Sequence, residues 1–270
     1  MKQEELSKIN EIGWNQAAYQ AWVNRHRLPS SYSQLLKENP KKTVSHYLGY
    51  MGDVKGKKII NLLGSKGNKA VSLALLGASV TVVDISEGNR QYATELAEAV
   101  GVSLNYVVSD VLNLPSQDQG QLLDFDYVLL ELGVLHYFVD LNPLFEVVFK
   151  LLRPGGKFVL RDYHPFVSKL INIDDNKVVA KGNYFDEEVK EVEVAYSLLL
   201  TEVEREKLKK NSIRRWGLGE IVTAIITAGL TMESLEEEAG IRWAFPENSP
   251  DHIEDNIPGL FTILAKKPSC

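Results

Sequence analysis

Short apolar runs rich in β-branched residues alternate with helical patterns from Lys57 onward. The length and composition of these runs predict strands at residues 58–63, 79–84, 104–108, 127–130 and 157–160. Between the second and third runs, Tyr92, Leu96 and Val100 recur at the spacing of one helix face. This succession of strand, helix and strand predicts a mostly parallel sheet with right-handed crossovers and helices on both faces.

The N-terminal flank, residues 1–56, is predicted to be helical. Trp14, Ala18 and Trp22 recur every four residues, as they would on one face of a helix. Two further short helices are predicted, one ending before Pro40 and one after it. We therefore expect an N-terminal helical cap ahead of the sheet.

A middle segment, residues 167–212, breaks the alternation. Its apolar stretches at 177–180 and 192–196 predict a hairpin or small extra sheet, with Gly182-Asn183 as the candidate turn. We expect this β-rich segment to be an insertion and a candidate substrate lid over the active edge of the sheet.

The α/β pattern returns after the insertion. A helix is predicted at 218–228 and strands at 232–235 and 260–265. Residues 57–166 and 213–270 are therefore expected to form one α/β, Rossmann-like domain.

Composition supports a folded protein, because 44% hydrophobic and 24% charged residues are ordinary for a globular domain. The net charge of −6 provides no positive field for a phosphate backbone, so nucleic acid is disfavoured as a partner. The one cysteine, Cys270, is the last residue, which excludes an intramolecular disulfide and a cysteine-based metal site. Neither a secretion signal nor a run of roughly 18 apolar residues is present, so we expect a cytoplasmic protein without a membrane partner.

Candidate binding residues follow three strands of the predicted sheet. The first strand runs into a small-residue turn containing Gly64 and Gly67, and the next helix start offers free N–H groups to an anionic ligand. Asp84 ends the second strand, where a carboxylate can accept the hydroxyls of a ribose. Asp110 follows the third strand, near the expected place of an adenine amine. Together these strand ends outline a site for adenosine.

Each feature also has a purely structural interpretation. Gly64 and Gly67 fit a tight turn, Asp84 fits the cap of the following helix, and Asp110 fits an ordinary loop residue. Their register on successive strands favours a shared ligand site, because parallel strands end at the same edge of a sheet.

The segment 57–166 resembles the core of class I S-adenosylmethionine-dependent methyltransferases, a seven-stranded Rossmann-like fold. The matching pieces are IINLLGSKGNKAVSLALLGA, VTVVDIS, FDYVLLELGVLHYF and KLLRPGGKFVLRDYHPF. The Pro154-Gly155-Gly156 turn entering an apolar strand is the most specific of them. The resemblance implies S-adenosyl-L-methionine as cofactor, bound by Asn61, Gly64, Ser65, Gly67, Asp84, Ile85, Asp110, Val111, Glu131, Leu132 and Gly133.

The glycine turn departs from the family pattern. Asn61, Leu63 and Ser65 stand where the acidic residue and the first two glycines are usual, and Gly67 alone keeps a glycine position. An asparagine can still position a bridging water or an ammonium. A dinucleotide-dependent dehydrogenase is the rival interpretation, but its Gly-x-Gly-x-x-Gly turn is interrupted by Ser65 and Lys66.

Methyl transfer from a sulfonium is an in-line displacement, for which positioning outweighs a general base. His136, and His164 with Tyr163, are the candidate catalytic groups, although packing roles fit both histidines. The fourth-strand sequence Glu131-Leu132-Gly133-Val134 lacks the Pro-Pro-aromatic motif of adenine and glutamine methylation, and no cysteine is placed for cytosine methylation. We expect a small-molecule acceptor with an oxygen, nitrogen or carbon nucleophile, and no metal.

Aromatic residues of the N-terminal flank are candidates for a lid. Trp14, Tyr19 and Trp22 are placed to close over the cofactor, and Arg25 and Arg27 to bind a carboxylate, although an amphipathic helix packed on the sheet fits the same pattern. A non-catalytic protein that binds S-adenosylmethionine or S-adenosylhomocysteine stays an alternative, and the oligomeric state cannot be inferred from the sequence.

Overall fold

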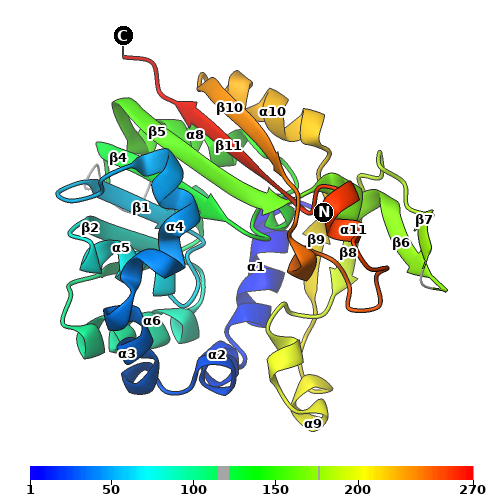
Figure 1. Ribbon diagram of the computed structural model, residues 1–270, viewed down its shortest axis with the longest axis horizontal. Helices are drawn as coiled ribbons and strands as arrows, with labels where there is room; N and C mark the ends of the chain where they lie inside the picture. The colour runs from blue at the N-terminus through cyan, green and yellow to red at the C-terminus, as the bar shows by residue number, and fades with distance from the viewer. Residues whose placement is uncertain (115–121, 176, 270) are drawn as a thin grey trace.

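A computed structural model describes residues 1–114, 122–175 and 177–269, so Cys270 lies outside the described residues. The chain begins with four helices: α1 (Gln3–Trp14), α2 (Ala18–His26), α3 (Pro29–Glu38) and α4 (Pro40–Met51). The expected helical cap is therefore present ahead of the sheet (Figure 1).

A seven-stranded sheet forms the centre of the molecule, in the order β10-β11-β5-β4-β1-β2-β3. Its strands are β1 (Lys58–Leu62), β2 (Ser79–Asp84), β3 (Asn105–Val108), β4 (Phe125–Glu131), β5 (Leu152–Tyr163), β10 (Thr231–Glu238) and β11 (Leu260–Lys266). All pairings are parallel except the two that β11 makes with β5 and β10. The predicted Rossmann-like fold is confirmed, and the strand order reverses between β1 and β4.

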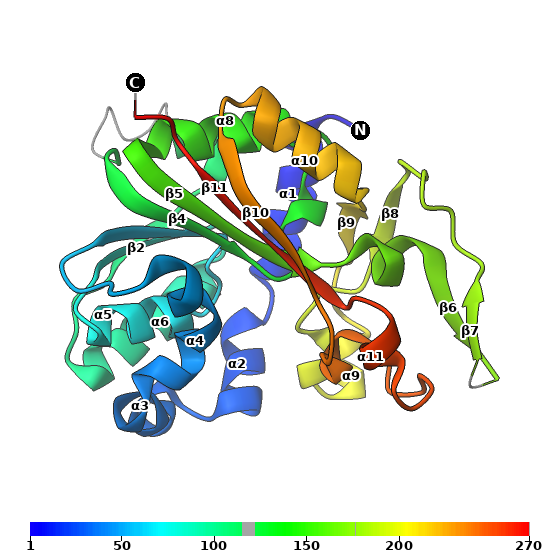
Figure 2. The same ribbon diagram turned by 45° about the horizontal axis from the view of Figure 1, so that its top comes forward.

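Helices cover both faces of the sheet (Figure 2). The main helices are α5 (Asn68–Leu75), α6 (Glu87–Val100), α8 (Asn142–Leu151) and α10 (Leu218–Thr227). On β1, Ile59 faces the core built with α4 and α5, whereas Ile60 and Leu62 face the core built with α8 and α10. Alternate strand residues thus enter two separate apolar layers, which explains why these strands are apolar throughout.

The inserted segment differs from the predicted hairpin. β7 (Lys177–Ala180) pairs with the preceding β6 (Ile171–Asp174), and β8 (Val189–Val192) pairs with β9 (Asn211–Arg214). Gly182 does not form the predicted turn, because its N–H donates to the carbonyl of Leu170 at 2.8 Å and the chain continues along that backbone. The hairpin prediction was therefore wrong in its partners.

Short elements complete the fold: α9 (Glu202–Arg205), α11 (Ile253–Asn256), the 3-10 turns η1 (Val111–Asn113), η2 (Leu135–Tyr137), η4 (Ser197–Leu199) and η5 (Arg242–Ala244), and the π turn η3 (Phe166–Leu170). None of the helices within the described ranges is long and apolar enough to span a bilayer.

The predicted continuous stripe of Trp14, Ala18 and Trp22 is split between two helices. α1 ends at Trp14, where the Gly13 carbonyl accepts from the Tyr196 hydroxyl at 2.7 Å and the Ala17 N–H donates to the same hydroxyl at 3.1 Å. A further helical turn would pair these two backbone groups with each other, so the Tyr196 hydroxyl replaces that helical hydrogen bond. The break lets α1 cross the carboxyl edge of the sheet while α2 packs on α6 (Figure 1).

The Asn10 side chain links α1 to β9 of the inserted segment by two hydrogen bonds. Its amide donates to the Ser212 carbonyl at 2.9 Å and its carbonyl accepts from the Ser212 N–H at 2.9 Å, and the side chain is buried. Asn10 therefore acts as an added pairing partner for the edge of β9.

Asn10→Ala should lower the free energy of unfolding by about 1–3 kcal/mol, because both Ser212 backbone groups lose their partner in a buried place. Urea denaturation followed by circular dichroism measures this. Lys8→Ala, at an exposed position on the same helix, is the control and should change stability little. Equal effects of the two substitutions would contradict the pairing role.

Candidate functional site

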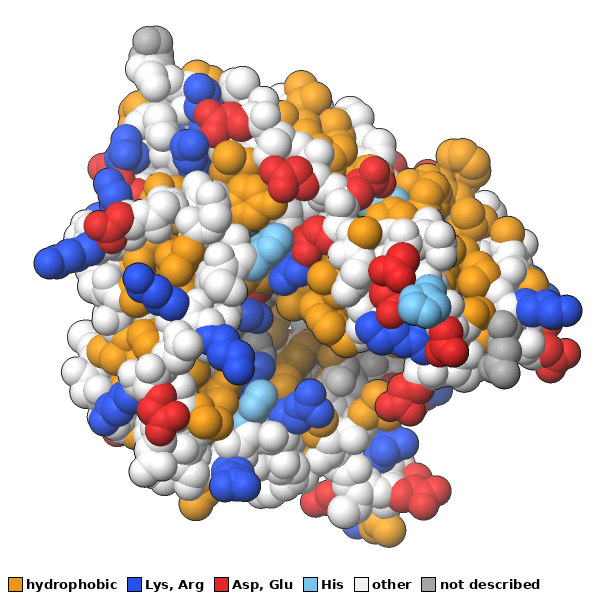
Figure 3. Space-filling model, viewed as in Figure 1, with side chains coloured by type: hydrophobic (Ala, Val, Ile, Leu, Met, Phe, Trp, Pro, Cys, Tyr) orange, Lys and Arg blue, Asp and Glu red, His pale blue; other side chains and the backbone are white. Residues whose placement is uncertain are grey.

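A cavity of about 420 Å³ lies at the carboxyl ends of the strands, on both sides of the point where the strand order reverses. Figure 3 shows a hollow near the middle of this face of the molecule. Eleven of the cavity-lining residues were predicted as site residues: Gly64, Ser65, Asp84, Ile85, Asp110, Val111, Glu131, Leu132, Gly133, His136 and Tyr163. The structure therefore brings these strand ends to one place, as open α/β sheets do at a switch point.

The turn after β1 keeps a left-handed backbone without its usual glycines. Leu63, Ser65 and Gly67 have φ values of 48°, 50° and 69°, at the three positions where the family pattern has glycine. A left-handed conformation costs a non-glycine residue about 1–2 kcal/mol. Gly64 is required for space instead, because a Cβ there would lie 2.7 Å from Val82 and 2.9 Å from the Asn61 Oδ1.

Asn61 and Gly67 contact neighbouring elements of the protein and do not line the cavity. Asn61 is fully buried, its amide donates to the Leu129 carbonyl at 3.4 Å, and it is not among the residues that line the cavity. Gly67 is likewise absent from the lining and precedes α5, packed against Ala93. Their contacts therefore fix the conformation of the turn after β1 and do not place these two residues in the cavity wall.

The carboxylate of Asp84 joins several segments. Its Oδ2 accepts from the Ser65 N–H at 2.9 Å, and its Oδ1 accepts from the Ser86 N–H at 2.9 Å and the Asn89 amide at 3.0 Å. Burial raises the pKa of Asp84, while these hydrogen bonds oppose the rise. Oδ2 has room for one ligand hydroxyl, whereas Oδ1 is already used twice.

Two residues that sequence reasoning missed connect Asp84 to the lid. Asn89 accepts at its Oδ1 from the Trp22 indole N–H at 2.7 Å while its amide donates to Asp84. Ser86, rather than Asp84, caps α6, because its hydroxyl accepts from the Asn89 N–H. The position of α2 is thereby linked to the carboxylate.

Asp110 and Val111 lie at the end of β3. The Asp110 Oδ1 accepts from the Leu112 N–H at 2.9 Å, so this residue caps η1 and lines the cavity as well. The structural interpretation and the binding interpretation are therefore compatible.

The turn after β4 is held by a buried carboxylate that the sequence did not reveal. Asp162 accepts from the N–H groups of Gly133 at 2.6 Å and of Tyr163 at 2.7 Å, and at 3.3 Å from each of two residues after Gly133. This fixes Leu132 and Gly133 at φ values of 50° and 76°. The adjoining Glu131 carboxylate accepts at Oε2 from the Tyr47 hydroxyl at 2.6 Å and pairs with Lys69 at 2.8 Å, which leaves its Oε1 for a ligand.

The three candidate catalytic residues differ in position. His136 and Tyr163 line the cavity, and both lie next to Gly133. His164 is absent from the lining, because it is buried beside β10, where its Nε2 lies 2.8 Å from the Glu237 carboxylate and its Nδ1 accepts from the Phe166 N–H. The packing interpretation fits His164 better than a catalytic one.

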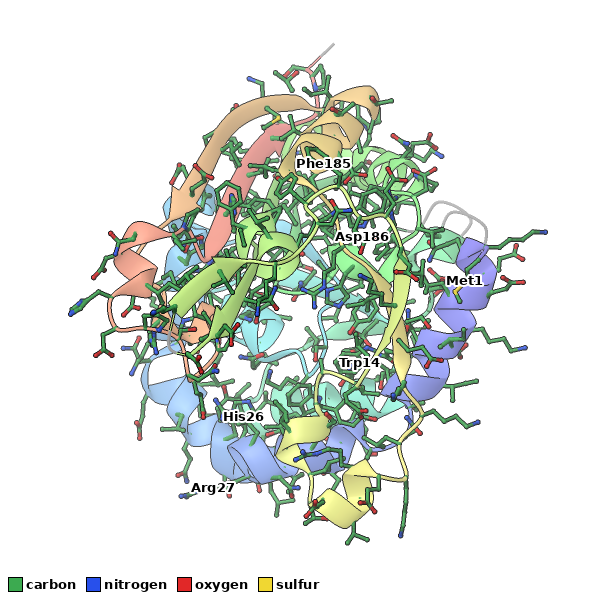
Figure 4. All side chains as sticks on the ribbon, turned by 90° about the vertical axis from the view of Figure 1, so that its right-hand side faces the viewer. Met1, Trp14, His26, Arg27, Phe185 and Asp186 are labelled. Carbon is green, nitrogen blue, oxygen red and sulfur yellow. The ribbon has the colours of Figure 1, made fainter. Side chains whose placement is uncertain are left out.

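The aromatic residues of the N-terminal flank also differ in whether they line the cavity. Trp14 and Trp22 line the cavity, whereas the Tyr19 hydroxyl donates to Glu95 at 2.6 Å on α6. Figure 4 shows Trp14 and His26 at the edge of the central opening and Arg27 farther out. Of the three aromatic residues predicted for a lid, the two tryptophans therefore line the cavity and Tyr19 does not.

Two substitutions in the turn after β1 should distinguish the cost of a left-handed backbone at Ser65 from the lack of room for a side chain at Gly64. Ser65→Gly should leave the free energy of unfolding unchanged or raise it by up to about 1 kcal/mol, because a left-handed residue is relieved. Gly64→Ala should lower it by about 1–3 kcal/mol, because the added methyl group overlaps Val82 and Asn61. Urea titrations measure both, and a larger loss for Ser65→Gly than for Gly64→Ala would disprove this explanation.

Burial, with a contribution from Arg215, lowers the pKa of His136 from 6.5 to about 3. The unfolded chain therefore takes up a proton before the folded protein does, so this residue's contribution to stability is complete above pH 6.5 and falls as the pH falls. His136→Asn should reduce the loss of stability between pH 7 and pH 5, by up to about 1 kcal/mol after screening. His252→Asn, at an exposed histidine, is the control, and identical pH slopes for wild type and His136→Asn would contradict the prediction.

Part of the chain is similar in sequence to known proteins. Residues 63–160 match the family model described as a methyltransferase domain. The chain is 29% identical over 165 residues to a ubiquinone biosynthesis O-methyltransferase of Psychrobacter cryohalolentis, covering 58% of this chain and 62% of that protein. It is also 29% identical to a demethylmenaquinone methyltransferase of Thermus thermophilus, over 40% of this chain and 48% of that protein. The chain thus spans about half the length of the curated relatives it matches.

Solved structures share the fold over more of the chain. An S-adenosylmethionine-dependent methyltransferase from Mesorhizobium loti has a TM-score of 0.61 at 21% identity, covering 83% of this chain and 97% of that one. A magnesium protoporphyrin IX methyltransferase from Synechocystis with bound S-adenosylhomocysteine has a TM-score of 0.56 at 13% identity, covering 97% and 99%. Residues 63–160 are therefore similar to the methyltransferase domain family, and most of the chain has the fold of these solved structures.

Proposed function

We propose that this protein is an S-adenosylmethionine-dependent methyltransferase that acts on a small molecule. The observation that carries the proposal is that one cavity combines the left-handed turn after β1 with the Asp84, Asp110 and Glu131 carboxylates. These groups come from four neighbouring parallel strands, and the cavity continues to His136 and Tyr163. A nucleoside at one end and an acceptor at the other fit this arrangement.

The residues present suit the cofactor. Asp84 Oδ2 would accept from a ribose hydroxyl, Asp110 and Val111 would lie beside the adenine, and Glu131 Oε1 would accept from the ammonium of the amino-acid part. When bound, S-adenosylmethionine supplies an electrophilic methyl group on a positively charged sulfur.

The chain's own contribution is mainly positioning. Tyr163 and Gly133 border the acceptor end, and Trp14 limits access of water from the lid side. Alignment of two reactants supplies up to about 7–11 kcal/mol, against about 3–5 kcal/mol for a general base. His136 is neutral at physiological pH and can accept a hydrogen bond from the acceptor, but its lowered pKa makes it a weak proton acceptor, so its proposed role is secondary.

Relatives named ubiquinone biosynthesis O-methyltransferase favour oxygen over nitrogen or carbon as the atom that accepts the methyl group. Net charge and the lone cysteine support a cytoplasmic protein with a small-molecule substrate rather than a nucleic acid.

Asp84→Asn should weaken the binding of S-adenosylhomocysteine by about 10- to 100-fold, because a charge-assisted hydrogen bond is lost. Isothermal titration calorimetry measures the affinity, and circular dichroism shows whether the variant is folded. Glu98→Gln, exposed on α6, is the control and should bind as wild type does.

Transfer of a labelled methyl group from S-adenosylmethionine into a metabolite extract tests the activity itself. We expect labelled product with wild type and much less with Asp84→Asn. Binding without any labelled product would favour a non-catalytic sensor, and the absence of binding by wild type would overturn the proposal.

A further inference from the structure

A row of polar residues crosses the face of the sheet that α4 covers. Glu131, at the end of β4, is paired in register with Arg161 on β5, and Arg161 is paired with Thr262 on β11. Residues directly opposite each other on neighbouring strands point to the same face of a sheet. α4 packs on this face, on the other side of the sheet from α8 and α10 (Figure 2). The polar row therefore lies beneath α4 and ends, at Glu131, in the wall of the cavity.

α4 contributes a hydroxyl group that contacts Glu131. Tyr47 is buried, and its hydroxyl donates to the Glu131 Oε2 at 2.6 Å. The Lys69 ammonium lies 2.8 Å from the same oxygen. Two partners on one oxygen restrict the orientation of the carboxylate and leave Oε1 for a ligand.

An ion pair holds the other end of the polar row. The Arg161 Nε donates to the Glu238 Oε1 at 2.9 Å, and its Nη2 pairs with Oε2 of the same carboxylate. The Thr262 hydroxyl donates to the Glu238 Oε1 at 2.8 Å and lies 3.0 Å from the Nε2 of His46 on α4. A bidentate pair between arginine and a carboxylate has a specific geometry. Arg161 is therefore held in place beneath α4.

The Tyr47 hydroxyl interacts with both ends of the polar row. Burial and the Glu131 carboxylate raise the pKa of Tyr47, and the Arg161 guanidinium opposes this rise. Tyr47 therefore stays protonated and remains a hydrogen-bond donor at physiological pH. A buried carboxylate such as Glu131 is stable only when it is paired and hydrogen-bonded, so loss of this donor bears directly on Glu131.

Most of these groups lie outside the part of the chain that matches the methyltransferase domain family. The match covers residues 63–160, and the groups beyond it are Tyr47, Arg161, Glu238 and Thr262. None of these four is among the described residues that line the cavity. Any effect on a bound ligand must therefore pass through Glu131, the member of the polar row that lines the cavity.

We propose that Tyr47 is a positioning residue, which holds the Glu131 carboxylate so that Oε1 meets the cofactor. The ion pair of Arg161 with Glu238 supplies a fixed cation beside the Tyr47 hydroxyl. The inference rests on the proposed function, in which Glu131 accepts from the ammonium of S-adenosylmethionine, and it adds the residues that orient this carboxylate.

Tyr47→Phe tests this role, because it removes the hydroxyl and keeps the buried ring. S-adenosylhomocysteine carries the ammonium, whereas 5′-methylthioadenosine has the same nucleoside and thioether without the amino-acid part. Tyr47→Phe should weaken the binding of S-adenosylhomocysteine about five- to tenfold and change the binding of 5′-methylthioadenosine less than about twofold. Isothermal titration calorimetry measures both affinities, and circular dichroism shows whether the variant is folded.

Tyr127→Phe is the matched control. The Tyr127 hydroxyl on β4 donates to the Met51 carbonyl on α4 at 2.7 Å, so it joins the same two elements at a place other than Glu131. This substitution should lower the midpoint of urea denaturation, as Tyr47→Phe does, and leave S-adenosylhomocysteine affinity within about twofold of that of wild type.

A double-mutant cycle distinguishes positioning from packing. In a Glu131→Gln background, Tyr47→Phe should change S-adenosylhomocysteine affinity less than about twofold, because no carboxylate is left to orient. An equal loss in both backgrounds, or an equal loss for both nucleosides, would assign Tyr47 a structural role and overturn the proposal. Unchanged S-adenosylhomocysteine affinity of Tyr47→Phe or of Glu131→Gln would overturn it as well. Wild type that binds neither nucleoside would instead overturn the proposed function, so the two failures are distinguishable.

Discussion

The buried carboxylate of Asp84 holds together the segments on which the cavity depends. It receives hydrogen bonds from the turn after β1 through Ser65 and from the start of α6 through Ser86 and Asn89. Asn89 extends the connection to Trp22 on α2. A group at the end of one strand therefore orients a loop, a helix and a lid, and its burial makes each of these hydrogen bonds hard to replace with water.

A second buried carboxylate performs the same task on the neighbouring strand. Asp162 holds the turn after β4 through the N–H groups around Gly133, as Asp84 holds Ser65. The left-handed residues Leu63, Ser65 and Leu132 all lie in these two turns and all line the cavity. Strained backbone is retained where surrounding bonds fix it and where a ligand is expected to approach.

The sequence predicted what depends on local pattern. Apolar runs located the central strands, and the rule that parallel strands end at one edge brought Asp84, Asp110 and Glu131 together. It could not reveal Asp162 or Asn89, because their roles depend on partners in other elements. The sequence also did not predict the strand partners in the insertion. Residues 177–180 could pair with a preceding or a following strand, and the apolar pattern alone does not distinguish the two.

The turn after β1 shows that a loop shape can persist when its characteristic residues change. Hydrogen bonds to Asp84 keep Ser65 left-handed, so the glycine there is dispensable while Gly64 is fixed by contact with Asn61. The same changes alter the charge of the loop, because a neutral Asn61 replaces the usual acid and Lys66 adds a cation. Glu131, on the next strand, is then the carboxylate that balances Lys69, and only one of the two lysines is neutralised. The sequence changes in this turn therefore preserve its geometry and make its electrostatic potential more positive, which bears on ligand charge rather than on fold.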